Sequence, residues 1–230
     1  MKRPQPAGKA EPGRIGTDEA GKGDYFGPLV VAAVWADEEM EEILRAQNVR
    51  DSKRVSDGIC HRLAKEVAGL CPNQVVKIFP QKYNLLISTM KNLNRLLGWA
   101  HARAIESLLE ELESRLPNRK GTLTVVADRF GDEAFLEQAL MKKGRKATLQ
   151  QRVKAEEETV VAAASLLARA GFLQGLERLS KECGITLPKG ASNVLSAGRQ
   201  VAAKGGEALL NKVAKTHFKT TKQIITPKKN

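Results

Sequence analysis

The chain has 230 residues, of which 42% are hydrophobic and 28% charged, and this balance is typical of one globular domain with a sizeable buried core. A mostly disordered chain is excluded, and no apolar run approaches the ~20 residues that a membrane-spanning helix needs. The formal net charge of +12 favours a polyanionic partner, and an aromatic content of only 4% makes phosphate contacts a better binding mode than base stacking.

The first residues and the cysteines indicate the compartment. Residues 1–13 are rich in Pro, Gly and basic side chains but lack the apolar core of a signal peptide, so we expect a disordered basic tail. The three cysteines, Cys60, Cys71 and Cys183, are odd in number and form no C-x-x-C pair. This pattern indicates reduced thiols in a cytoplasmic protein.

Two strands joined by a glycine-rich turn open the ordered region. The first strand begins at Arg14 and delivers Asp18, the turn covers residues 20–28, and the apolar run 29–35 forms the second strand. The next expected elements are a helix start, a polar loop, a helix and a strand, at residues 37–42, 49–56, 59–70 and 74–79.

Apolar residues at spacings of three or four continue from Ile87 to Leu112 and predict one long amphipathic helix that ends near Pro117. Residues 122–127 predict a buried strand that delivers Asp128 at its end. A helix, a strand, an Ala-rich helix and further helices with glycine breaks follow, at residues 132–142, 147–153, 160–170 and up to about 215. The order of elements suggests an α/β fold with a central mixed sheet and a helical C-terminal region.

Acidic side chains gather at three places. Asp18 and Glu19 lie beside glycines, Asp128 ends a strand, and residues 156–158 are three glutamates before the Ala-rich helix. A carboxylate at a strand end is costly to desolvate unless a cation compensates it, and Mg²⁺ and Mn²⁺ prefer such oxygen ligands. No zinc spacing and no Ser–His or Cys–His pairing is visible. The alternative is that these are separate surface acids in caps and turns.

Asp18 and Glu19 present a geometric difficulty, because neighbouring residues in a strand point to opposite faces. They can share one site only if the strand ends or bulges there, and the glycines directly afterwards favour this. Gly21-Lys22-Gly23 matches neither a dinucleotide fingerprint nor a P-loop. Such a turn lets a nucleic-acid backbone approach closely, although a simple hairpin turn with an exposed lysine explains it equally well.

Residues 16–33, GTDEAGKGDYFGPLVVAA, resemble the signature of bacterial ribonuclease HIII, a member of the type 2 ribonuclease H family. Further segments resemble this family in the same order along the chain, namely Asp51-Ser52-Lys53, residues 92–101, Asp128 after its strand, and residues 154–169, 187–192 and 213–218. The likeness covers about residues 14–220, so we expect one catalytic domain at 14–220 between basic tails at 1–13 and 221–230.

The resemblance implies the ribonuclease H fold and an endonuclease that hydrolyses the RNA strand of RNA–DNA hybrids, leaving 5′-phosphate and 3′-hydroxyl ends. It also implies two Mg²⁺ or Mn²⁺ ions and a four-acid site, made of Asp18, Glu19, Asp128 and Glu156. Glu157 is a rival for the fourth position because three glutamates run together.

The resemblance also implies substrate contacts. Gly21, Lys22 and Gly23 would contact RNA 2′-hydroxyls, and Ser52 and Lys53 would hold phosphate. Asn92 and Asn94 fall inside the predicted long helix, where asparagine has low propensity, which hints at substrate contact. An acid-free basic end would add phosphate contacts or else be a solvated tail; it contains Lys212, Lys215, Lys219, Lys222, Lys228 and Lys229.

Two departures from the family pattern bear on the substrate. Only about a dozen residues precede the first strand, so we expect the usual N-terminal domain resembling TATA-binding protein to be absent from this chain. Tyr25 and Tyr83 are the only tyrosines, and neither matches the C-terminal tyrosine with which ribonuclease HII senses an RNA–DNA junction. This favours cleavage within RNA tracts over excision of single ribonucleotides, which stays an alternative. A non-catalytic hybrid-binding module would be indicated by a missing acid, and none is missing. We expect a monomer that does not bind membranes.

Overall fold

A mixed five-stranded sheet forms the centre of the computed structural model, which describes residues 13–49, 55–117, 121–128 and 134–226. The strands lie in the order β3-β2-β1-β4-β5; they are β1 (Arg14–Ala20), β2 (Leu29–Ala36), β3 (Asn73–Ile78), β4 (Thr124–Asp128) and β5 (Thr148–Arg152). β4 is parallel to β1 and β5, whereas β2 is antiparallel to β1 and β3. The expected mixed sheet is confirmed.

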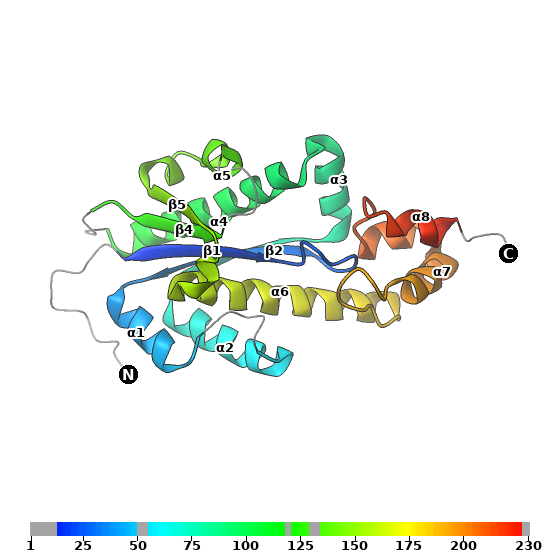
Figure 1. Cartoon of the computed structure of the whole chain (residues 1–230), viewed down its shortest axis with the longest axis horizontal. Coiled ribbons are helices and arrows are strands. Elements are labelled where there is room, and N and C mark those ends of the chain that lie inside the picture. The colour runs from blue at the N-terminus through cyan, green and yellow to red at the C-terminus, as the bar shows by residue number, and fades with distance from the viewer. Residues whose placement is uncertain (1–12, 50–54, 118–120, 129–133, 227–230) are drawn as a thin grey trace.

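Helices cover both faces of this sheet (Figure 1). They are α1 (Glu38–Ala46), α2 (Asp57–Leu70), α3 (Pro80–Met90), α4 (Leu93–Arg115), α5 (Ala134–Ala139), α6 (Thr159–Cys183), α7 (Leu195–Val213) and α8 (Thr220–Ile225), with 3-10 helices η2 (Gly144–Lys146) and η3 (Ala155–Glu157). Figure 1 shows α1, α2 and α6 on one face, α3, α4 and α5 on the other, and α7 and α8 beyond one end of the sheet.

β2 is buried along its whole length because every residue of LVVAAVWA is apolar. Its side chains alternate between the two helical layers. Val30, Ala32 and Val34 belong to the core under α6, while Val31 and Ala33 belong to the core under α4. The sheet thus separates two hydrophobic cores. The strand β1, which pairs with β2, lies between the same two cores.

The prediction of one long helix is wrong in one respect, because this segment forms two helices. α3 ends at Lys91, which has a left-handed backbone with φ of 52°, and Asn92 is the N-cap of α4. The Asn92 Oδ1 accepts hydrogen bonds from the amides of Asn94 and Arg95 at 2.8 and 3.2 Å. The apolar periodicity continues across the break because both helices pack on the same core.

α6 is longer than expected and lies very close to β1. A Cβ atom at Gly16 would lie 2.2 Å from the Val160 carbonyl carbon, so only glycine permits this approach. By length and composition α6 is the one helix among the described residues that could cross a membrane, but 78% of its most apolar window is buried inside the structure. That burial is typical of a core helix.

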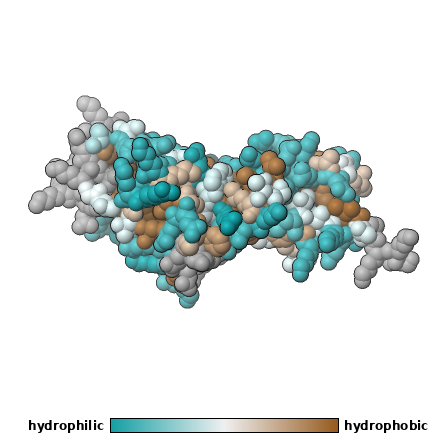
Figure 2. Space-filling view, turned by 90° about the horizontal axis from the view of Figure 1, so that it is seen from above, coloured by the Kyte–Doolittle hydropathy of each residue, from teal (hydrophilic) through white to brown (hydrophobic). Residues whose placement is uncertain are grey.

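The C-terminal region folds further than the boundary expected at residue 220. Thr221 and Ile224 of α8 are buried, so the folded chain continues to at least Ile225. The expected glycine break is present in α7, where Gly205 and Gly206 leave helical geometry. Hydrophilic residues dominate the face shown in Figure 2, and apolar residues form small separate groups on it.

Candidate active site

Asp18 and Asp128 are brought together by strand register. The parallel ladder between β1 and β4 ends with the pair Thr17 and Ala127, and each acid is the next residue on its strand. Neighbouring strands lie ~4.8 Å apart, so the two carboxylates emerge side by side. Both line a cavity of about 500 Å³, together with Glu19. Three of the four acids chosen from the sequence therefore meet at one place.

Glu19 reaches this cavity without a bulge, because β1 ends one residue later and its ladder with β4 has already stopped at Thr17. β1 keeps regular pairing with β2 through Ala20 and Val30, and Asp18 and Glu19 point to opposite faces. Asp18 is hydrogen-bonded to Ser165 of α6, whereas Glu19 is hydrogen-bonded to His101 of α4. The two acids share one cavity because the ladder with β4 stops beside them and opens the sheet there.

His101 holds Glu19 through a buried chain of hydrogen bonds. The Thr17 hydroxyl donates to the Ala32 carbonyl at 2.8 Å, and His101 Nδ1 lies 2.8 Å from the same hydroxyl oxygen. His101 Nε2 lies 3.2 Å from the Glu19 carboxylate. Because the Thr17 proton is already donated, Nδ1 is the donor in its contact with that hydroxyl oxygen. The side chain of His101 is completely buried, so the Glu19 carboxylate has a fixed orientation.

The two neighbouring carboxylates differ in their electrostatics. Burial, followed by the charge of Glu19, raises the pKa of Asp18 to about 7. Burial also pushes the pKa of Glu19 upward, but His101 and then Lys22 outweigh it, so that pKa is lowered. The negative charge around Asp18 is thus only partly compensated by the protein's own groups.

Asp128 connects β4 to the turn that carries the fourth acid. Its Oδ1 accepts a hydrogen bond from the Ala155 amide at 3.3 Å, and Glu156 is the next residue in η3. The side chain of Glu156 lies outside the described part of the structure. Glu157 is exposed, and Glu158 is bound by two arginines. The choice between Glu156 and Glu157 stays a prediction.

The donor set suits a hard divalent cation. Asp18, Glu19 and Asp128 supply only carboxylate oxygens to one cavity, which is the ligand type that Mg²⁺ and Mn²⁺ prefer. Among the side chains that the structure describes, no three His, Cys, Asp or Glu form a metal-holding group by themselves. A fourth ligand from η3 would complete the set.

The glycine-rich loop forms the rim of the cavity, and the two glycines that line the cavity differ. Gly21 has φ of +84°, and a Cβ there would lie 2.2 Å from the Pro28 carbonyl oxygen, so the fold itself requires glycine. A Cβ at Gly23 would meet nothing within 4 Å. The space in front of Gly23 is therefore open to a ligand. Lys22 lies 3.5 Å from Glu19 and is partly exposed.

Two positively charged side chains that line the cavity were not recognised from the sequence. Arg169 and Lys189 line it, and both are held by Asp57 at the start of α2, at 2.8 and 2.7 Å. These hydrogen bonds lower the pKa of Asp57, with Lys189 the larger cause and Arg169 the next. No local pattern marks these residues, because three separate segments bring them together.

The other expected substrate residues have mixed outcomes. Ser52 and Lys53 lie outside the described residues. Asn92 is the N-cap of α4 and Asn94 lies in its first turn, so neither is in mid-helix, and neither lines the cavity. Capping accounts for Asn92 at this position, and substrate contact by Asn92 and Asn94 stays a prediction.

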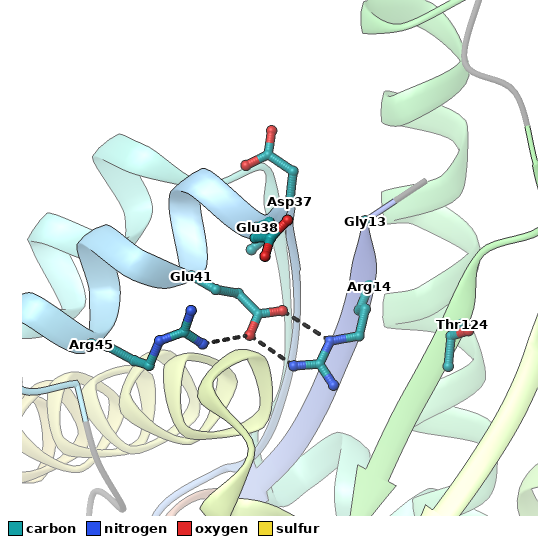
Figure 3. Close-up of a pocket in the computed structure, with 8 residues that line it drawn as sticks. Gly13, Arg14, Asp37, Glu38, Glu41, Arg45 and Thr124 are labelled. Atoms are coloured by element: carbon teal, nitrogen blue, oxygen red, sulfur yellow. Dashed lines mark hydrogen bonds and ion pairs between the residues drawn. The ribbon is translucent and has the colours of Figure 1, made fainter. Parts of the chain in front are cut away.

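A second cavity, of about 440 Å³, lies at the opposite end of β1 (Figure 3). Figure 3 shows Arg14 and Arg45 both directed at Glu41. Arg14 makes two hydrogen bonds to Glu41, at 2.9 and 2.7 Å, and Glu41 is nearly buried. Arg14, Arg45 and Glu41 satisfy one another's charges and Asp37 caps α1, so these side chains have a structural role.

Solved structures match the fold closely. The crystal structure of Bst ribonuclease HIII in complex with Mn²⁺ superposes with a TM-score of 0.83 at 30% identity, covering 93% of this chain and 69% of that one. Ribonuclease HII from Archaeoglobus fulgidus, in a complex with PCNA, gives 0.65 at 28% identity, covering 88% and 93%. Fold and acidic site together define an endoribonuclease of the ribonuclease H type.

Sequence comparison gives the family. The profile of ribonuclease HII matches residues 15–221, so the chain belongs to the ribonuclease HII family. Ribonuclease HIII of Protochlamydia amoebophila is 46% identical over 212 residues, covering 92% of this chain and 68% of that protein. Ribonuclease HIII of Chlamydia pneumoniae is 43% identical over 218 residues, covering 94% and 71%. Within the family, the chain is therefore a homologue of ribonuclease HIII, and the resemblance seen in its sequence is confirmed.

Proposed function

We propose that the protein cleaves the RNA strand of RNA–DNA hybrids at the cavity between the ends of β1 and β4. The observation that carries this proposal is the meeting of Asp18, Glu19 and Asp128 in one cavity whose rim is the glycine-rich loop. The names of the relatives, ribonuclease HIII, support the substrate class.

Asp18, Glu19, Asp128 and Glu156 would hold two divalent ions, and the Mn²⁺ in the Bst ribonuclease HIII structure supports dependence on a divalent metal. Bound there, such ions supply an activated water and stabilise the leaving oxygen, which would leave 5′-phosphate and 3′-hydroxyl ends. The protein's contribution is preorganisation. His101 fixes the Glu19 carboxylate, Ser165 orients Asp18, and the Ala155 amide orients Asp128.

The rim residues would select RNA. The open space at Gly23 lets a sugar–phosphate backbone approach the loop, where main-chain groups can bind a 2′-hydroxyl. Lys22, Arg169 and Lys189 surround the same cavity with positive charge and would hold phosphates. Asp57, which binds the last two cations, keeps them in place before the substrate arrives.

The decisive experiment compares three labelled duplexes with Mg²⁺, with Mn²⁺ and with EDTA. They are a hybrid with a long RNA tract, duplex DNA with one embedded ribonucleotide, and all-DNA duplex. We expect metal-dependent cleavage within the RNA tract and no cleavage of DNA, with products that carry 5′-phosphate by end analysis. Stronger cleavage of the single ribonucleotide would instead establish ribonuclease HII-like activity. Binding without cleavage under every metal condition would establish a non-catalytic module.

We further propose that the enzyme is a cytoplasmic monomer. All three cysteines are free and buried, which supports a reducing compartment. Light scattering during gel filtration would give the mass of a single chain. A dimer mass at micromolar protein would refute the monomer.

A further inference from the structure

A completely buried lysine lies behind the glycine-rich loop. Lys215 follows α7, and its Nζ donates hydrogen bonds to the carbonyls of Asp24 and Gly27 at 2.8 and 2.7 Å, with a longer contact to Phe26 at 3.4 Å. Three carbonyls of one turn therefore converge on one ammonium group. Lys215 was grouped with the solvent-facing basic end in the sequence, and that placement is wrong because its side chain points inward.

The main chain around Lys215 pairs with the same turn. The Lys215 amide donates to the Tyr25 carbonyl at 2.8 Å, and the Gly27 amide donates to the Val213 carbonyl at 3.1 Å. Phe26 and Ala214 form an antiparallel bridge. The second half of the glycine-rich loop thus pairs, like a short strand, with the segment after α7.

Burying a lysine in this position costs desolvation free energy. This cost indicates that its hydrogen bonds to the turn have a structural role. Burial lowers the pKa of Lys215 to about 7, and the charge of Asp24 opposes this. An apolar side chain of equal length would avoid the desolvation cost but would leave carbonyls of the turn without a donor. The Tyr83 ring, 5.7 Å from Nζ, adds a cation–π contact.

The turn held by Lys215 continues directly into the rim of the cavity. The Asp24 amide donates to the Gly21 carbonyl at 3.4 Å, and Gly21 and Gly27 both have positive φ. A shift of the Asp24 carbonyl would therefore move Gly23 and Lys22. Gly190 also holds the turn, because its amide donates to the Asp24 carboxylate at 2.6 Å and its carbonyl accepts from the Tyr25 amide at 2.8 Å, whereas Gly23 is exposed and a Cβ there would meet no atom within 4 Å.

We propose that Lys215 is a positioning residue for substrate binding, which acts by holding the turn at residues 24–27 and thereby the rim glycines and Lys22. The proposal rests on the proposed function of this rim in binding the hybrid. Lys215 itself touches no substrate, because its side chain is enclosed by protein.

The test is Lys215→Met, which keeps most of the length of the side chain and removes the donors. We expect the KM for a hybrid to rise about tenfold while kcat changes less than about threefold, because the carboxylates on β1 and β4 stay in place. The matched control is Lys204→Met. Lys204 also donates to a main-chain carbonyl, that of Cys183 at 2.7 Å, but lies away from the rim. Its KM should equal that of the wild type.

A double variant decides whether Lys215 acts through the loop. Lys22→Ala alone should raise KM, and Lys22→Ala combined with Lys215→Met should raise it little further, because both changes disable the same rim. Fully additive effects, or a lowered Tm with an unchanged KM, would overturn the proposal.

Hydrogen exchange of the amides at residues 21–27 separates the proposal from the function of the rim. It is measured on Lys215→Met and Lys215→Gln, each at a fixed interval below its own Tm, so that a loss of global stability does not mask the result. Faster exchange confined to this turn supports the positioning role even if Lys22→Ala leaves KM unchanged, which would refute only the proposed role of the rim. Unchanged exchange in both variants would overturn the role of Lys215.

Discussion

At the scale of single residues, the pair Asp18 and Glu19 shows how a catalytic site can oppose stability. Burial and a like charge both disfavour the ionised form of Asp18, whose pKa is raised to about 7. Removing that charge should therefore help the fold while removing a proposed metal ligand.

We predict that Asp18→Asn and Asp128→Asn each abolish cleavage of a hybrid and leave the circular dichroism spectrum unchanged. Asp18→Asn should also raise the Tm of the metal-free protein, by ~2–4 °C if about 1 kcal/mol of repulsion is relieved. Exposed Glu42 of α1 is a suitable control, and Glu42→Gln should cleave normally. Cleavage near the wild-type rate in either Asp variant would remove that residue from the site.

The fourth acid can be assigned with a pair of neighbouring variants. We predict that Glu156→Gln abolishes cleavage, because η3 places this residue directly after the amide that binds Asp128. Glu157→Gln should keep activity within about twofold, since this residue is exposed. The measurement is cleavage against Mn²⁺ concentration for both variants, and the reverse ranking would assign Glu157.

The acidic positions could be singled out from the sequence, but their grouping into one four-acid site rested on the resemblance to ribonuclease HIII. The side chains that contact these acids could not be predicted from the sequence. His101 lies within α4 among apolar residues, and its contact with Glu19 depends on how α4 packs across the sheet. Ser165, Arg169 and Lys189 are equally inconspicuous, because strand and helix patterns predict which face is buried but not which distant side chain it meets.

At the scale of elements, an ion network anchors η3 to the far end of the sheet. Glu158, at the start of α6, is bound by Arg14 of β1 at 2.9 Å and by Arg152 of β5 at 2.6 Å. Arg14 also binds Glu41 of α1 (Figure 3). The turn that carries Glu156 is therefore held by two strands and a helix.

We predict that Arg14→Lys lowers stability by about 1–2 kcal/mol and raises the Mn²⁺ concentration needed for half-maximal activity. A lysine has no planar fork and cannot bind Glu41 through two nitrogens while also reaching Glu158. Thermal unfolding and a metal titration would measure the two effects. Arg62→Lys on α2, which breaks only the exposed pair with Glu66, should change neither. A loss of stability without any change in metal dependence would show that the network does not support η3.

The elements themselves were predicted well where hydrophobic periodicity and length agreed. The strands at the acidic sites and the Ala-rich helix are confirmed, with shifts of one or two residues at the starts. The break between α3 and α4 was missed because only two residues mark it. They are the N-cap residue Asn92 and Lys91, whose backbone is left-handed. The end of the folded region was also placed too early, because the sequence of α8 is short and basic while its burial depends on α7.

At the scale of the molecule, the charge of +12 predicts binding that is sensitive to salt. Exposed Lys219 and Lys222 flank the buried face of α8, so their charges can be removed without disturbing its packing. We predict that Lys219→Gln with Lys222→Gln weakens hybrid binding and reduces the log–log salt slope by up to about one unit per lost contact. Lys65→Gln on α2, far from α8 in Figure 1, is the control. An unchanged slope would show that these lysines are only solvated.

Because Lys215 anchors the glycine-rich turn, the turn can be held in place only after Lys215 has been synthesised. The carbonyls that Lys215 binds lie 188 to 191 residues earlier in the chain. At ~5–20 residues per second, a ribosome would take roughly 10–40 seconds to supply the anchor after the turn has been made. The proposed catalytic acids all precede Lys215 in the chain, so a nascent chain would possess its carboxylates before its means of holding a duplex. Competence to bind nucleic acid would thus arrive last, when the domain is almost fully synthesised.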